Sequence, residues 1–319
     1  MKLLNKKNIL KLLLVLSIYI IVEVLINVGI IDSYILLNIV LIGINIILAV
    51  SLNLITGITG QLSLGHAAFM SIGAYASGIM TAKLGLPFIV GIISAAVFAA
   101  IAGVIIGIPT LRLKGDYLAI ATLGFGEIVR IIGLNNDYIG GATGLNDIPQ
   151  YTNWTWVYLG VVLTVFTIRN FINSYNGRAC ISIREDEIAS EAMGVNTTYY
   201  KVLVFTTGAF FAGIAGALYA NYFFFIKPDS FGFMKSIDIL VIVVFGGMGS
   251  IPGSIIAAIL LSIISIFLQS IPELRMVVYA VILFLIMVYR PQGLLGKGQF
   301  DLFKNKKKGS VINGSSSTS

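Results

Sequence analysis

The side chains that could carry acid–base or metal chemistry are few in this sequence and far apart. Its 319 residues include one histidine, His66, and one cysteine, Cys180. This supply excludes both a disulfide framework and a zinc site built from several His and Cys ligands. Residues 293–298 read GLLGKG, which lacks the spacing and the Ser or Thr of an ATP-binding Walker A motif. The sequence therefore predicts no catalytic site, and no cofactor or metal bound by this chain.

The composition is typical of an integral membrane protein. Hydrophobic residues make up 57% of it and charged residues 11%, with a mean hydropathy of +0.96. A soluble domain carries about 25% charged residues. The apolar runs are continuous rather than alternating with period two, which excludes an outer-membrane barrel. We expect an all-α polytopic membrane protein with about ten transmembrane helices, or eight to ten given the uncertain boundaries.

The positions of the basic residues predict the topology. The net charge is +7, and Lys residues gather in residues 1–11 and after residue 296. Since Lys and Arg mark cytoplasmic ends, both termini should be cytoplasmic: a basic N-terminus (1–11), a transmembrane domain (12–290) and a basic, disordered tail (291–319). No basic face on a soluble domain is present to bind nucleic acid. The expected spans are 12–31, 34–56, one ending near 82, 88–108, 117–134, 154–172, 199–222, 236–245, one ending near 269, and 275–289.

Polar residues and glycines interrupt these spans in two places, near residues 57–66 and 246–254. Non-helical backbone at membrane depth is tolerated only where protein or a wet cavity covers it. Two such breaks at matching positions of two halves indicate a possible parallel internal repeat and a path across the membrane. The candidate path residues are an Asn stripe on one helix face and the polar or small residues of both breaks: Asn38, Asn45, Asn53, Gln61, Ser63, His66, Gly246, Gly247, Gly249 and Ser250.

One further span carries two opposite charges, Glu127 and Arg130. At a spacing of i,i+3 they can pair on one helix face, which reduces the cost of burying either charge. We interpret them as an intramembrane packing pair rather than as part of the path.

The longest polar loop, residues 173–198, contains Arg178 and Arg184 and should be cytoplasmic. Its central part predicts one short amphipathic helix, with Ile188, Ala192 and Val195 on one face and a glycine, Gly194, at its end. Such a helix could dock in a groove of a partner protein. A solvated connector is the alternative that the pattern leaves open.

Several stretches together carry a resemblance. The loop reads REDE at residues 184–187, then Glu191-Ala192 and Gly194. Four other motifs are TGQLSLGHAAF (59–69), KGDYLAIATLGFGEIVR (114–130), FGGMGSIPG (245–253) and YRPQGLLG (289–296). In this order the sequence resembles the LivM-type permeases of bacterial ABC importers for branched-chain amino acids.

The resemblance implies a permease subunit of the bacterial plasma (inner) membrane that passes Leu, Ile or Val into the cytoplasm. Its implied partners are a second, LivH-type permease, two ATP-binding subunits that hold ATP and Mg, an extracytoplasmic substrate-binding protein, and membrane lipid. The implied ATPase-coupling residues are Arg178, Arg184, Glu185, Asp186, Glu187, Glu191, Ala192 and Gly194. Importers of urea or short amides, and less so a stand-alone channel or secondary transporter, remain alternatives. We also expect Gly194 to adopt a left-handed or closely packed backbone.

Overall fold

Eleven α-helices form the described part of the chain. The computed structural model describes residues 6–110, 113, 115–268, 277, 278, 280, 281, 284, 288, 289, 293 and 294. The helices in order are α1 (Lys6–Asn27), α2 (Ser33–Asn53), α3 (His66–Gly78), α4 (Phe88–Thr110), α5 (Asp116–Leu134), α6 (Trp154–Asn173), α7 (Tyr175–Glu185), α8 (Glu187–Ala192), α9 (Thr197–Phe223), α10 (Phe233–Gly246) and α11 (Ile251–Phe267). Two π-helical turns extend α2 and α3, namely η1 (Leu54–Ile58) and η2 (Ile79–Lys83). Three 3₁₀ turns, η3 (Asp137–Ile139), η4 (Gly141–Thr143) and η5 (Pro228–Phe231), lie in the connections.

The all-α, polytopic architecture is confirmed. Among the described residues, five helices are long and apolar enough to cross a membrane: Ser33–Ile58, Phe88–Thr110, Asp116–Leu134, Trp154–Asn173 and Thr197–Phe223. The apolar stretches Val15–Asn27 and Ile251–Phe267 are shorter. Each of the first nine expected spans coincides with a helix. About half of the tenth span, 275–289, most of the tail and the side chains of the first eleven residues lie outside the described residues.

One helix boundary differs from the prediction. We expected the fourth span to end before Pro109, but α4 continues through it to Thr110. Proline lacks an N–H and disturbs a helix at the turn that precedes it. Pro109 therefore cannot donate to the carbonyl of Ile105, and α4 ends one residue later.

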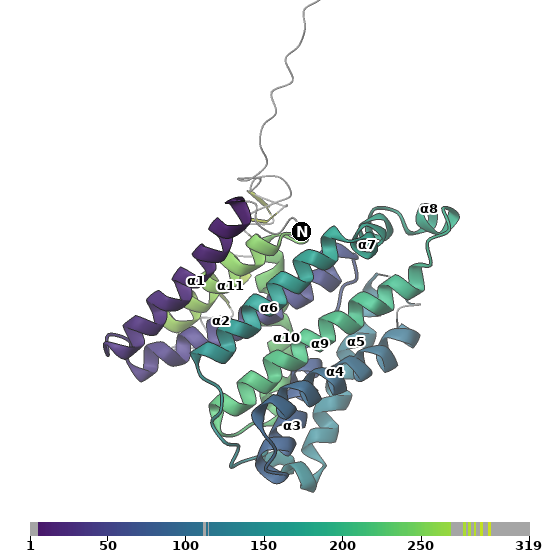
Figure 1. The fold of residues 1–319 in the computed structure, drawn as a ribbon. Helices are drawn as coiled ribbons and strands as arrows, with labels where there is room; N and C mark the ends of the chain where they lie inside the picture. The colour runs from purple at the N-terminus through teal and green to yellow at the C-terminus, as the bar shows by residue number, and fades with distance from the viewer. Residues whose placement is uncertain are drawn as a thin grey trace, which may run out of the picture.

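Helix α9 is the centre of the bundle, and small residues let its neighbours approach closely (Figure 1). Helix α3 runs in the same direction, since Phe69 stacks on Phe205 and Ser77 accepts a hydrogen bond from Asn221. Where they cross, a Cβ on Gly73 would collide with the backbone of Gly213. Glycines at such crossings bring helix backbones together in membranes, where van der Waals packing drives association.

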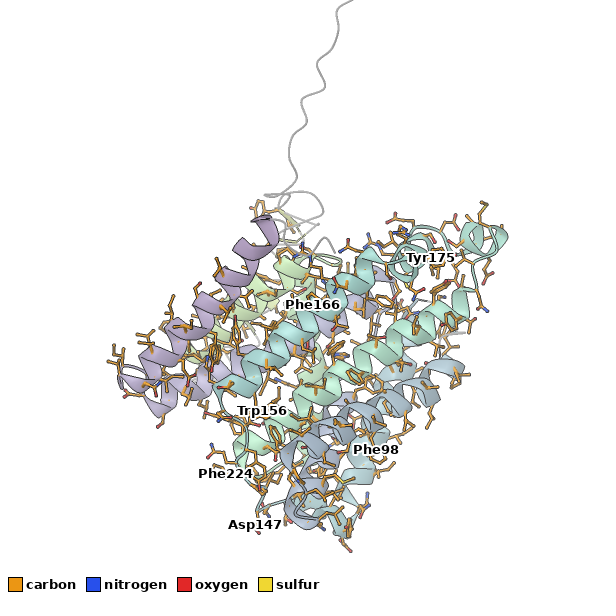
Figure 2. All side chains as sticks on the ribbon, in the orientation of Figure 1. Phe98, Asp147, Trp156, Phe166, Tyr175 and Phe224 are labelled. Atoms are coloured by element: carbon orange, nitrogen blue, oxygen red, sulfur yellow. The ribbon has the colours of Figure 1, made fainter. Side chains whose placement is uncertain are left out.

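The bundle has two distinct ends. Figure 2 shows Tyr175 at one end and Asp147 and Phe224 at the opposite end. The first carries α7 and α8 and is called the α7 end below (Figure 1). Along the flanks, Phe98 of α4 and Phe166 of α6 are 49% and 63% exposed, as suits side chains that face lipid.

Candidate functional site

Glycine-rich stretches from distant parts of the sequence meet toward the α7 end. The Gly57 backbone lies against the amide nitrogen of Gly249, and Gly293 lies against Gly247. The amide of Leu294 donates a hydrogen bond of 3.0 Å to the carbonyl of Phe245. We call this place the glycine junction; it consists of Gly57, Gly60, Gly247, Gly249 and Gly293. Both predicted breaks and the motif near residue 293 therefore converge on one place.

The backbone at this junction adopts a π-helical turn and, at two glycines, positive φ angles. Helix α2 loosens into the π-helical turn η1, a feature often found at functional sites. The side-chain oxygen of Asn53 accepts a 2.7 Å hydrogen bond from the amide of Gly249. Gly249 has φ +88°, and Gly60 has φ +72°, values that L side chains rarely adopt. Asn53 therefore joins α2 to the turn between α10 and α11.

Residues 59–65 leave η1 and return into the bundle without regular structure. Side chains of other helices accept hydrogen bonds from N–H groups of this segment and of the first turn of α3, as the membrane interior requires. Leu64 donates its amide hydrogen to Oγ1 of Thr122 at 3.0 Å, and Ala67 donates to Oγ of Ser236 at 3.2 Å. His66 begins α3 fully buried, with Nε2 2.9 Å from Oγ of Ser51. This contact joins His66 to α2, and the assignment of His66 to the path stays a prediction.

Several polar atoms beside this segment have no hydrogen-bond partner among the described residues. They are both amide atoms of Gln61, Oγ of Ser63, Nδ1 of His66 and Oγ1 of Thr56. Buried polar groups are otherwise almost always paired with protein or water. A path lined by water or substrate beside residues 56–66 would supply these hydrogen bonds, and the assignment of Gln61 and Ser63 to such a path stays a prediction.

The predicted Asn stripe faces α10 and α11. Asn45 donates to Oγ of Ser262 at 3.1 Å and accepts from Nζ of Lys235 at 3.3 Å. Asn38, nearer the start of α2, donates to the carbonyl of Tyr34 in its own helix. The sequence analysis missed Lys235, although a charged side chain at the start of an apolar helix is itself a signal of function. Gly246 and Ser250 flank the turn, where Ser250 caps α11 through the amide of Gly253.

Glu127 and Arg130 form the expected pair, with 2.8 Å between Oε2 and Nε. Asp229 of η5, which the sequence analysis missed, holds Nη1 of Arg130 at 2.7 Å. The side chains of Glu127, Arg130 and Asp229 are 34%, 32% and 67% exposed. Exposed charges on a membrane-spanning helix are costly in lipid. This face of α5 is therefore suited to water or to another protein.

The polar loop contains two helices, not the single one expected. The chain bends at Asp186, whose Oδ1 accepts the amide hydrogen of Ala189 and caps α8. An N-cap requires non-helical backbone, so a new helix starts there. Gly194 ends α8 with φ +84°, and the amide of Val195 bonds to the carbonyl of Ser190 at 3.0 Å. This Schellman arrangement confirms the left-handed backbone expected for Gly194.

The acidic residues of the loop fasten α8 to α9. Oε1 of Glu187 lies 2.6 Å from Nζ of Lys201, and Oε1 of Glu191 accepts from the hydroxyl of Thr197, also at 2.6 Å. Ile188 is 73% exposed, and beyond it Ala192 and Met193 are also exposed. The loop therefore turns apolar side chains outward while two of its acids are engaged internally.

Two other loop residues differ in where they point. Arg178 is exposed and its Nη1 donates to the carbonyl of Asn173 at 3.3 Å. Arg184 points inward, and its Nη1 donates to the carbonyl of Gly57 at the glycine junction. Its Nη2 lies 3.4 Å from Oε1 of Glu185, which is 63% exposed. Across the described part of the chain, no three His, Cys, Asp or Glu side chains gather as a metal site needs.

Residues 34–287 match the family model described as branched-chain amino acid transport system / permease component. The chain belongs to this family. It is therefore a multi-pass membrane protein of a transport-permease family, which is not a family of enzymes.

Individual relatives agree with this membership. The high-affinity branched-chain amino acid transport system permease protein LivM of Escherichia coli (strain K12) is 40% identical over 285 residues, which cover 78% of this chain and 67% of that protein. LivH of the same strain is 27% identical, with coverage of 80% and 92%. A probable LivM permease of Methanocaldococcus jannaschii is 27% identical, with coverage of 85% and 96%. No solved structure is significantly similar to this chain.

The charged group on α5 predicts an incomplete rescue. R130Q should lower the Tm of the purified chain by about 3 °C, because two carboxylates lose their shared cation. The charge swap E127R/R130E should recover only part of the loss, since the acid placed at position 130 faces Asp229. Adding D229N should recover more. Thermal unfolding in detergent measures all four proteins, and full recovery by E127R/R130E would show that Asp229 contributes nothing.

Cys180 of α7 provides a pH-dependent measure of how this helix packs. It is fully buried, and burial raises the pKa of its thiol to about 12. Since the thiolate is the reactive form, a raised pKa means that alkylation is slow at pH 7 and accelerates as the pH rises toward 12. At pH 8 the folded chain should react with a maleimide about 100-fold more slowly than the same chain in SDS. Equal rates would contradict the packing of α7.

Proposed function

We propose that this chain is a permease subunit of an ABC importer that carries branched-chain amino acids into the cytoplasm. Family membership supports the transport role, and relatives named for branched-chain amino acid transport support this substrate class. The observation that carries the ATP-driven mechanism is the α7–α8 loop. It offers an exposed apolar surface at one end of a membrane bundle, as a helix that docks in a partner's groove requires.

The assembly that this function needs has several parts. Relatives of both LivM and LivH type favour a complex with a second permease of LivH type. The partly exposed charges of Glu127, Arg130 and Asp229 favour the same conclusion, since a second subunit would cover them. Two ATP-binding subunits, which hold ATP and Mg, would dock on α8, and an extracytoplasmic binding protein would deliver the amino acid.

The topology follows from the docking surface. If the ATPases bind α8, the α7 end faces the cytoplasm, and the bundle spans the inner membrane. The start of α1 lies toward this end (Figure 1), so the N-terminus is cytoplasmic, and the basic tail suits the same side.

Transport would proceed by alternating access. Closure of the ATPases on ATP would move α7 and α8 as one unit, and the helices around the glycine junction would shift in response. The polar atoms of residues 56–66 and the Asn45–Lys235–Ser262 group are the candidate lining that this movement exposes to either side.

Uptake of labelled leucine by cells with and without the gene tests the substrate class. We expect uptake to fall to background without the gene, and unlabelled isoleucine and valine, but not urea, to compete in its presence. Competition by urea alone, or urea uptake that depends on the gene, would instead support the urea and amide importers. Uptake that follows an ion gradient and survives loss of the ATPase genes would support a secondary transporter.

The docking surface has its own test. I188E places a charge on the exposed face of α8, so it should reduce recovery of the ATPase subunits with the tagged permease by about tenfold. The matched control is L84E in the connection between η2 and α4, which replaces an exposed leucine at the opposite end of the bundle and outside the membrane-spanning helices. The permease itself should remain in the membrane at wild-type abundance with I188E. Wild-type recovery of the ATPases with I188E would contradict docking at α8.

A further inference from the structure

Arg184 joins the α7–α8 loop to the glycine junction. It is in the last turn of α7, and its side chain is only 24% exposed. Nη1 donates a hydrogen bond to the carbonyl of Gly57. The Cγ of Arg184 would lie 3.1 Å from a Cβ on Gly60, and Nη1 would lie 3.0 Å from a Cβ on Gly249. One side chain therefore touches both breaks of the membrane domain.

The chemistry of this contact suits a guanidinium. The last carbonyls of a helix lack intrahelical partners and carry partial negative charge. Gly57 lies in η1, which ends the long α2–η1 helix. A planar guanidinium can donate to such a carbonyl while it lies close to the backbone of Gly249, and the aliphatic part of the side chain lies next to Gly60. An ammonium on a flexible chain would keep the charge but lose this planar fit.

The other end of the connection is closely packed and hydrogen-bonded. Cys180 and Ile183 are buried on α7, and Cys180 shares a helix face with Arg184 at a spacing of i,i+4. Asp186 caps α8 directly after α7, and Glu187 ties α8 to Lys201. A displacement of α8 would therefore carry α7 and the Arg184 side chain with it.

We infer that Arg184 is the positioning residue that transmits movement of α7 and α8 to the glycine junction. It acts inside the membrane domain and makes no contact with the ATPase, unlike the exposed residues of α8. This inference rests on the proposed function, and it assigns to one arginine the step that connects ATP hydrolysis to rearrangement of the breaks.

The experiment compares R184Q and R184K with R169Q, which removes an exposed arginine at the end of α6. The reconstituted importer, with its second permease, ATPases and binding protein, is measured for assembly, ATP hydrolysis and leucine uptake. In R184Q we expect normal assembly but about tenfold more ATP hydrolysed per leucine transported. R184K should lie between R184Q and the wild type, and R169Q should match the wild type. A wild-type ratio in R184Q would overturn the inference, as would loss of the ATPases from the complex, which would make Arg184 a docking residue.

A second measurement does not depend on transport. In the purified chain, R184Q should increase Cys180 alkylation at pH 8 and hydrogen exchange of the amides in residues 57–65 and 247–250, because the junction loses its connection to α7. R169Q should change neither. If both readouts stay at wild-type values in R184Q, the contact transmits nothing and the inference fails. If they change while the wild-type complex takes up no leucine, the proposed function fails and the connection stands.

Discussion

The rest of this structure depends on how the N–H and C=O groups of non-helical backbone are hydrogen-bonded inside a membrane bundle. At the glycine junction three chain segments approach at backbone distance, which only residues without side chains permit. Side chains from three helices bond the backbone groups at and beside the junction: Asn53 accepts from Gly249, Arg184 donates to Gly57, and Thr122 accepts from Leu64. Each bond replaces one that water would make outside the membrane. The need to pair these groups therefore fixes where α3 and α11 begin and where α7 packs.

This arrangement also makes the junction a suitable place for movement. Glycine-to-glycine contacts bury little apolar area, and the hydrogen bonds that hold them come from single side chains. A modest displacement could exchange one set of such bonds for another without opening the apolar core around α9. The membrane domain thus combines a closely packed centre, where α3 and α4 pack on α9, with a junction held by few hydrogen bonds next to the α7–α8 loop.

Much of this could be predicted from the sequence because it depends on local properties. Apolar runs located the helices, and glycines located the breaks and the left-handed end at Gly194. What the sequence could not predict involves partners distant along the chain. Asp229 joins Arg130 across 99 positions, and Lys235 joins Asn45 across 190. The break at Asp186 was missed because its capping bond competes with a helical pattern that continues through it.

The charged group on α5 extends this reasoning beyond one chain. Arg130 is balanced by two carboxylates, so Glu127, Arg130 and Asp229 together carry one net negative charge, and their side chains are 32–67% exposed in the described part of the chain. Lipid is a poor environment for that charge, whereas a second subunit can supply hydrogen bonds or a cation to it. The polar atoms of residues 56–66 are a second unsatisfied feature, inside the bundle. Both features agree with a transport complex that contains another permease subunit, as the relatives of LivM and LivH type imply.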